Sequence, residues 1–339
     1  TCVGGNKGIQ KDLDDGIDTI GKKMTVCQLY AKQIRHRGNV RYNTKNGRKR
    51  LMKLLEEDKL GGCPIDSVKL SDAKEWAIRM KEKGISYKTI SNDKRSLKAA
   101  FYTAIQDDCI RKNPFDFQLN TVIEDDTEPK VPLTPAQEES FLSFAQNDKV
   151  YQKYYDELII LLGTGLRISE LCGLTDTDID FENRIINVDH QLLRSAETGY
   201  YIETPKTKSG IRQIPMSEKV YEAFNRVLKR RRGAKAVTID GYSNFLFLNR
   251  DGYPKTATNY DGMFRGLAKK YNKYHEEALP KVMTPHTLRH TFCTNMANAG
   301  MNPKALQYIM GYSNITMTLN YYAHATFDSA KAEMLRIAA

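Results

Sequence analysis

The sequence of 339 residues has no long apolar run, no closely spaced cysteine pair and no acidic residue between Met24 and Arg50. Its longest apolar stretch starts at Leu158 and is far shorter than the roughly 20 residues that a membrane span needs. No signal peptide is evident at the start, so we expect a cytoplasmic protein with no membrane partner. The six cysteines lack a CxxC pair, which argues against a zinc ribbon and a disulfide framework and predicts reduced thiols.

The composition points to a polyanionic partner. The formal net charge is +11 and the isoelectric point is about 9.2, an excess that concerns binding rather than fold. The length favours about two domains, and 40% hydrophobic residues are enough to build their cores. The chain opens at Thr1 without an initiator methionine, so we expect that an N-terminal portion is missing.

The first predicted domain is helical. Residues 1–23 are rich in Gly, Lys and Asp and are predicted to be a linker or flexible lead-in. Residues 24–117 contain apolar positions at helical spacing, so we expect a small all-helical domain. The positions of these stripes are Leu51, Leu54 and Leu55, then Ala73, Trp76, Ala77 and Met80, then Ile90, Leu97, Phe101 and Ile105.

Two basic groups in this domain are candidates for binding phosphates. The segment from Met24 to Arg50 has eight Lys or Arg residues, and a second group interleaves with the apolar positions of residues 87–98. A basic helix face can lie along a nucleic-acid backbone, although a charge run is also typical of an ordinary solvated face. The candidates are Arg48, Lys49 and Arg50 in the first group, and Lys88, Lys94, Arg95 and Lys98 in the second.

An acidic, proline-containing segment marks the domain boundary. Residues 118–132 show no helical stripe, and we expect an extended linker there. The second domain, residues 133–326, begins with a helix-start signal in which Thr134 is the N-cap and Pro135 the first helical residue.

Short strands are predicted within the second domain. Residues 184–188 and 201–204 have β-type composition, and residues 211–216 are expected to return antiparallel across a turn at 208–210. Helices occupy most of the remainder, so the fold class is mainly α with a small β component.

Three short segments carry the candidate chemistry. They read GLRISEL at residues 165–171, HTLRH at 286–290 and YYAH at 321–324. Two arginines that keep their charge, a histidine and a late tyrosine suit a reaction in which a phenol attacks a phosphodiester and forms a covalent intermediate. Taken alone, Arg167 also fits an ordinary surface arginine beside a helix start.

Two segments of the sequence resemble metal sites. His286 and His290 have HxxxH spacing, but Thr287 stands where a zincin needs glutamate. The alternating carboxylates of residues 176–180 resemble the start of an EF-hand loop, but the glycine and glutamate required further on are absent. We therefore expect no metal site and interpret the carboxylates as a solvated turn.

Together, the three segments resemble the tyrosine recombinases, or phage-type integrases, and among them the integrases of bacterial conjugative transposons. The resemblance covers roughly residues 24–326. It implies a helical core-binding domain and a mixed α/β catalytic domain that clamp DNA from opposite sides. A further N-terminal domain that binds arm-type sites is expected in such integrases.

The resemblance assigns roles to individual residues. Arg167 and Arg289 would hold the scissile phosphate, and their charge would stabilise the transition state without a metal. His286 would be a hydrogen-bonding or acid/base group at the same phosphate. The family's lysine lies on a β-hairpin, where Lys208 is favoured over Lys206 as the acid that protonates the departing 5′ oxygen.

Two positions remain ambiguous. Tyr312 stands where the family commonly has histidine, and its phenol still donates one hydrogen bond. The family's tyrosine, small residue, histidine ending selects Tyr322 as the nucleophile, whereas the shorter spacing from position 312 in some members selects Tyr321. Tyr322 is preferred here, with Tyr321 as its packing neighbour.

The implied activity is site-specific cutting and rejoining of double-stranded DNA at element ends and target sites, through a 3′-phosphotyrosyl intermediate and a Holliday junction. No cofactor, metal or ATP is expected. The partners would be a homo-oligomer on DNA, from dimer to tetramer, and an excision or directionality factor, in the nucleoid of a bacterial cell. Residues 327–339 would dock on a neighbouring protomer or pack on their own domain. The alternatives are a type IB topoisomerase and a non-catalytic DNA-binding regulator.

Overall fold

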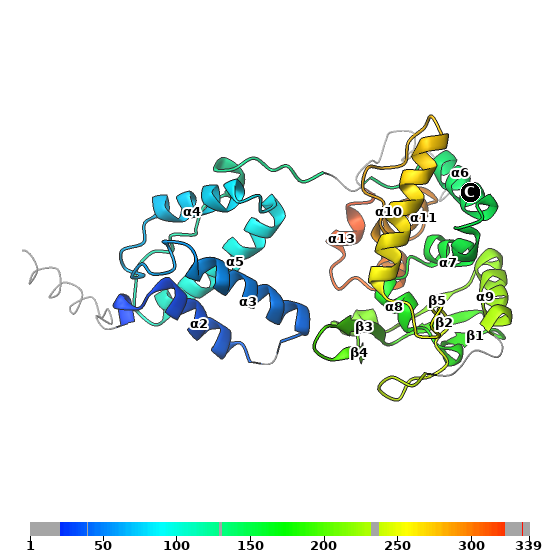
Figure 1. The fold of residues 1–339 in the computed structure, drawn as a ribbon, viewed down its shortest axis with the longest axis horizontal. Coiled ribbons are helices and arrows are strands. Elements are labelled where there is room, and N and C mark those ends of the chain that lie inside the picture. The colour runs from blue at the N-terminus through cyan, green and yellow to red at the C-terminus, as the bar shows by residue number, and fades with distance from the viewer. Residues whose placement is uncertain (1–20, 39, 129–130, 232–236, 323–333, 335–339) are drawn as a thin grey trace, which may run out of the picture. The chain divides into compact units, whose positions relative to one another are not determined.

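The computed structural model describes residues 21–38, 40–128, 131–231, 237–322 and Met334. The chain divides into two compact units, Thr1–Pro129 and Lys130–Ala339. Figure 1 colours the first unit blue to cyan and the second green to red. Residues 1–20 of the predicted lead-in and, apart from Met334, all of the predicted tail 327–339 lie outside the described residues.

The first unit is helical throughout its regular elements. Ser86 caps the longest helix, α5, by accepting a hydrogen bond from the Thr89 backbone N–H. The described elements are η1 (Gly21–Lys23), α2 (Val26–His36), α3 (Tyr42–Glu56), α4 (Leu70–Glu82), α5 (Tyr87–Gln106) and the 3-10 turn η2 (Leu119–Thr121).

The core of this unit gathers the apolar stripes of its helices. Trp76 of α4 and Phe101 of α5 both pack on Phe115, with ring centroids 5.7 and 5.4 Å away respectively. All three side chains are fully buried, and each such burial stabilises the fold by about 1.5–3 kcal/mol. Most of the predicted stripe positions are buried, which confirms the helical prediction; Leu54 and Ile105 are only partly so.

The start of the predicted linker belongs to this core. Leu119 and Ile123 are buried among the residues of the first unit. The structure therefore differs from the expected linker 118–132, because Leu119, Ile123 and the partly buried Val122 hold its first part on the helical core.

The second unit begins with the predicted cap. Thr134 accepts a hydrogen bond from the Gln137 N–H at 3.1 Å, and Pro135 starts α6. Its described elements are α6 (Pro135–Asn147), η3 (Gln152–Tyr154), α7 (Tyr155–Thr164), α8 (Ile168–Gly173), η4 (Asp176–Asp178), β1 (Ile179–Asp180), β2 (Ile185–Val188), β3 (Gln191–Ser195), β4 (Gly199–Glu203), η5 (Lys208–Gly210), β5 (Arg212–Pro215), α9 (Glu218–Arg231), α10 (Ala257–Tyr274), α11 (Pro285–Asn298), α12 (Pro303–Met310) and α13 (Thr316–Leu319).

The strands pair differently from the prediction. β1, β2 and β5 form a three-stranded antiparallel sheet with Ile186 opposite Ile214, and β3 pairs with β4. The predicted hairpin of residues 201–204 with 211–216 is therefore wrong. Residues 191–195 supply a closer partner for β4, while β5 crosses to β2, where Ile186 and Ile214 are both buried.

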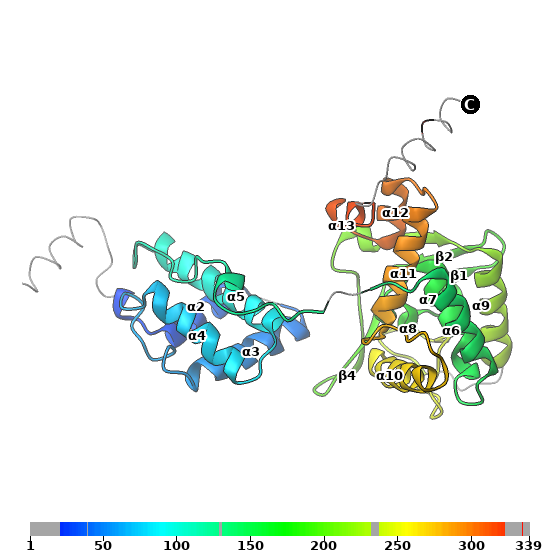
Figure 2. The same cartoon turned by 90° about the horizontal axis from the view of Figure 1, so that it is seen from above.

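Helix α7 occupies the centre of the second unit. It packs on α9 and α11, and its apolar side chains are almost all buried, as the adjacent ribbons in Figures 1 and 2 illustrate. The fold class, mainly α with small sheets, is confirmed. No helix in the described ranges is long and apolar enough to cross a membrane.

Candidate active site

A sharp turn between α7 and α8 positions Arg167. Gly165 ends α7 with φ of 63°, in the left-handed region that favours glycine. A Cβ on Gly165 would lie 2.5 Å from the Phe292 ring, so no other residue fits this turn unchanged. Arg167 is then the residue that precedes α8, and its side chain is only partly buried.

Arg289 approaches the same turn from α11. It is only 2% exposed, and its guanidinium donates hydrogen bonds to the carbonyl oxygens of Gly165 and Met310. Burial, and then the nearby charge of Arg167, lower the pKa of Arg289. An arginine keeps its proton in proteins even so, which leaves a fixed, desolvated cation at the centre of the unit.

Glu170 connects the arginines and was not selected from the sequence. This buried carboxylate bonds Arg167 Nη1 at 2.6 Å and Arg212 Nη2 at 2.9 Å. Burial raises its pKa, but the hydrogen bonds and charge of Arg212, with the charges of Arg167 and Arg289, outweigh that effect and lower it to about 2. The first turn of α8 and the start of β5 are thereby joined.

The turn that carries the lysine candidates lies beside this cluster. Gly311, which ends α12 with φ of 62°, accepts a hydrogen bond from Arg167 at 3.2 Å. A Cβ on Gly311 would be 3.1 Å from both Arg212 Nη1 and the Ser209 carbonyl oxygen. Lys208 begins this 3-10 turn and Lys206 precedes it by two residues; both side chains are exposed.

The aromatic candidates lie on the Arg289 side of the cluster. The Tyr312 ring is 5.1 Å from the Arg289 guanidinium carbon, and the Tyr321 hydroxyl hydrogen-bonds His290 Nδ1. The Tyr322 hydroxyl instead donates to the carbonyl oxygen of Met301. The two neighbouring phenols therefore have different surroundings.

The environment keeps the Tyr321 phenol protonated. Burial, followed by the adjoining Tyr312 and Cys293 groups, raises the pKa of Tyr321 far above its ordinary value. His286 is exposed at the start of α11, with its ring 5.5 Å from the His290 ring and nearly perpendicular to it. Deprotonating Tyr321 thus requires an acceptor close to its oxygen.

The phosphate-binding candidates of the first unit lie on α3 and α5. Lys94, Arg95 and Lys98 help to line a cavity of about 550 Å³. Lys98 is also paired with Asp116 at 2.5 Å, and Arg50 with the buried Asp93 at 2.5 Å. Lys88 and Lys49 are exposed, whereas Arg48 is partly buried.

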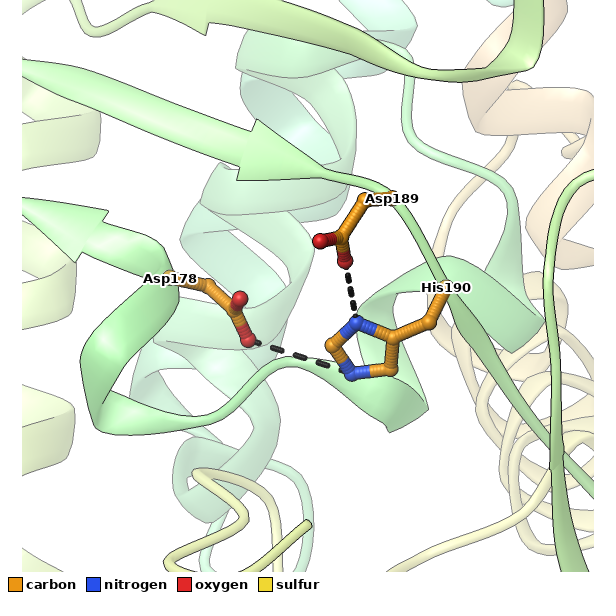
Figure 3. A group of neighbouring side chains, drawn as sticks. All are labelled: Asp178, Asp189 and His190. Carbon is orange, nitrogen blue, oxygen red and sulfur yellow. Dashed lines mark hydrogen bonds and ion pairs between the residues drawn. The ribbon is translucent and has the colours of Figure 1, made fainter. Parts of the chain in front are cut away.

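Within the described parts of the chain, one group of three side chains has the right types to hold a metal ion: Asp178, Asp189 and His190 (Figure 3). The side chains of this group are already engaged in hydrogen bonds with protein atoms. His190 Nδ1 lies 2.5 Å from Asp189, and its Nε2 lies 2.8 Å from the Gly173 carbonyl oxygen.

An oxygen lies within hydrogen-bond distance of each nitrogen of the His190 ring, so a metal ion that bound either nitrogen would have to displace one of these contacts. The carboxylate of Asp178 accepts two bonds from Thr175, each 2.7 Å long. Asp178 is buried, so its interpretation as part of a solvated turn is wrong. The cluster joins the end of α8 to the segment after β2.

Comparison with known proteins identifies the family. The Phage integrase family model matches residues 132–329. The transposase from transposon Tn916 of Enterococcus faecalis is 69% identical over 329 residues, which are 97% of this chain and 81% of that protein. The chain belongs to the phage integrase family. The resemblance to tyrosine recombinases is confirmed, and the chain is a DNA recombinase enzyme.

Solved structures of an integrase agree with this. The Tn1549 transposon integrase bound to a circular intermediate DNA is 78% identical, with a TM-score of 0.88, over 93% of this chain and 99% of that chain. The same integrase bound to transposon right end DNA has the same identity and TM-score, over 93% and 100% of the two chains. A lambda integrase dimer on a core site, at 16% identity, shares the fold alone, with a TM-score of 0.60 over 88% of this chain and 76% of that chain.

For this integrase, the structure brings together Arg167, Arg289, Tyr312 and Tyr321 and leaves Lys88 to Lys98 in the other unit. Sequence reasoning overlooked Glu170, Arg212 and His290. Glu170 lies inside the GLRISEL segment and His290 ends HTLRH, so two of the three were within the motifs. Arg212 carries no local signal, because only the crossing of β5 beside α8 brings it to Glu170.

Proposed function

We propose that this phage-type integrase excises and integrates a mobile element by cutting and rejoining DNA through a 3′-phosphotyrosyl intermediate. The observation that carries the proposal is the convergence of Arg167 and Arg289 at the Gly165 and Gly311 backbone, with a tyrosine beside them. Two fixed guanidiniums suit the non-bridging oxygens of a phosphodiester. The Tn1549 integrase structures with circular intermediate and right end DNA support the same chemistry here.

Tyr321 is the proposed nucleophile, in place of the Tyr322 preferred from the sequence. The Tyr321 phenol is on the side of Arg289 and Tyr312, whereas the Tyr322 phenol is held by a main-chain carbonyl. The spacing in the Tn1549 integrase supports this choice. Its structures were solved with one arginine or one tyrosine substituted, and these lie 154 positions apart. Arg167 and Tyr321 are also 154 positions apart, and Tyr322 is one further.

The remaining roles follow from position and chemistry. Arg167 and Arg289 hold the phosphate, and His286, which is exposed at the start of α11, is its hydrogen-bonding or acid/base group. Lys208 remains the proposed acid for the leaving 5′ oxygen, with Lys206 as the alternative; the close approach of the 208–210 turn to Gly311 favours Lys208. Tyr312 donates one hydrogen bond in the place where the family commonly has histidine.

The first unit is proposed to bind double-stranded DNA through α3 and α5. Lys94, Arg95 and Lys98 form its basic face, with Lys88 next to them. A homo-oligomer on DNA, from dimer to tetramer, and an excision or directionality factor complete the proposed set of partners. The lambda integrase dimer on its core site is a precedent for pairing on DNA. The enzyme would act on the nucleoid in the bacterial cytoplasm.

The test is trapping of the covalent intermediate. The protein is incubated in EDTA with nicked suicide duplexes from the ends of its element, and adducts are resolved on a denaturing gel. We expect an adduct with the unaltered protein and with Tyr322→Phe, and none with Tyr321→Phe. An adduct that survives Tyr321→Phe but not Tyr322→Phe would restore the original preference. Tight binding without any adduct would favour a non-catalytic regulator. In a parallel reaction on a supercoiled plasmid that carries the element ends, relaxed circles as the sole products would favour a topoisomerase.

A further inference from the structure

The hydroxyl of Tyr321 already has a partner that no role above uses. It forms a hydrogen bond with Nδ1 of His290, a residue of α11 that directly follows Arg289. The two ring centroids are 5.7 Å apart and the planes are inclined by 35°. One helix thus supplies both a phosphate-binding guanidinium and an imidazole at the attacking oxygen.

We propose that His290 orients the Tyr321 phenol and accepts its proton during attack on the DNA phosphate. This inference rests on the proposed function. The Tyr321 O–H bond breaks as the oxygen bonds to phosphorus, and the proton moves to His290 Nδ1. The bond from phosphorus to the 5′ oxygen breaks, and that oxygen leaves with the electron pair and takes a proton from the separate acid.

The other groups near this oxygen are poorer acceptors. Tyr312 offers a phenol, which is a weaker proton acceptor than an imidazole. Burial raises the pKa of Cys293 to about 12, which keeps the thiol neutral. Arg289 has no acceptor. His286 stands nearly perpendicular to His290, 5.5 Å from it, and is exposed toward the start of the helix. An imidazole, which ordinarily ionises near pH 6.5, suits proton acceptance at neutral pH.

The placement of His290 is a product of the same packing that buries Arg289. Residues 289 and 290 are neighbours on α11, so their side chains diverge by about 100° around the helix. Arg289 donates hydrogen bonds to the carbonyl oxygens of Gly165 and Met310. His290 instead forms its hydrogen bond with Tyr321, which lies just after α13. Cys293, Leu306 and Met310 form the small buried core behind this contact. The imidazole is therefore held by packing rather than by a flexible loop.

The experiment compares two DNA substrates. One is an ordinary suicide duplex, and the other carries a 5′-bridging phosphorothiolate, whose thiolate leaves without a proton. We expect His290→Gln to form the Tyr321 adduct about 100-fold more slowly on both substrates. Lys208→Ala should be slow only on the ordinary one, because the phosphorothiolate removes the need for an acid. His275→Gln is the matched control, since His275 stacks on Tyr271 and not on Tyr321.

The dependence on pH separates proton acceptance from a structural effect. For the unaltered protein, the adduct rate should rise as pH increases through the imidazole range, with Tyr321, Tyr312, Cys293, Arg289 and His286 as the other titratable groups at the site. For His290→Gln this rise should disappear. His290→Asn keeps an amide near the Nδ1 position, and it should keep the fold, measured by thermal melting, without restoring the rate.

The outcomes distinguish this inference from the proposed function. If the unaltered protein forms no adduct, the proposed function fails. If it forms a Tyr321 adduct and His290→Gln matches its rate and its pH profile, only the role of His290 is overturned. A slow His290→Gln protein that retains the rise with pH would likewise contradict proton acceptance.

Discussion

The two units hold their positive charges in opposite ways. In the first unit, Lys81 and Lys98 are partly exposed at the surface and each lies 2.5 Å from an aspartate. In the second, Arg289 and Arg212 are buried, and most of their hydrogen bonds go to main-chain carbonyls. Exposed pairs are weak and screened by salt, whereas buried cations are fixed and desolvated. We therefore expect substitutions in the first unit to change DNA affinity and substitutions at the buried arginines of the second unit to change the chemistry.

The largest effect is expected from Arg289→Lys. Lysine keeps the charge but cannot bridge the Gly165 and Met310 carbonyls while presenting a planar fork. The rate of adduct formation at saturating DNA should fall by about 100- to 1000-fold, with little change in binding measured by gel shift. Arg184→Lys is the control, because Arg184 is an exposed arginine paired with Glu218. Equal rates for both variants would remove Arg289 from the chemistry.

An intermediate effect concerns stability in acid. The pKa of Glu170 is lowered from 4.5 to about 2, so its contribution is present above pH 4.5 and is lost as pH falls toward 2. At neutral pH Glu170→Gln should cost about 3 kcal/mol in the free energy of unfolding. This loss of unfolding free energy, measured by urea denaturation at each pH, should become smaller as the pH falls from 4.5 toward 2. Glu182→Gln, at an exposed position, should show no such trend.

The smallest effect is expected on α5. Reversing Lys94 and Arg95 to glutamate should weaken DNA binding about tenfold and lower the slope of log K against log salt by about 2. The adduct rate at saturating DNA should stay unchanged, because these residues belong to the first unit. A matched reversal of Lys59 and Lys83, which are exposed and do not belong to α5, provides the comparison. Identical slopes for the two double variants would exclude α5 from the interface.

Local signals in the sequence predicted what local structure determines. The cap at Thr134 and the apolar stripes of the first unit were predictable, since each depends on residues within a turn or two. Strand pairing was not predictable, because β5 pairs with β2 although the β3–β4 hairpin lies between them in the sequence. The surroundings of Tyr321 and Tyr322 were equally hidden. Adjacent side chains after α13 diverge, and only the packing of α11 and α12 decides which one meets His290.

The carbonyl partners of Arg289 have a thermodynamic consequence. They orient the guanidinium but carry no net charge, and Glu170 is the carboxylate bonded to both Arg167 and Arg212. Three cations thus surround one anion, and the repulsion between these cations destabilises the folded enzyme until another anion binds. A phosphate that binds there stabilises the native state by mass action. DNA therefore stabilises the folded catalytic unit and is also its substrate.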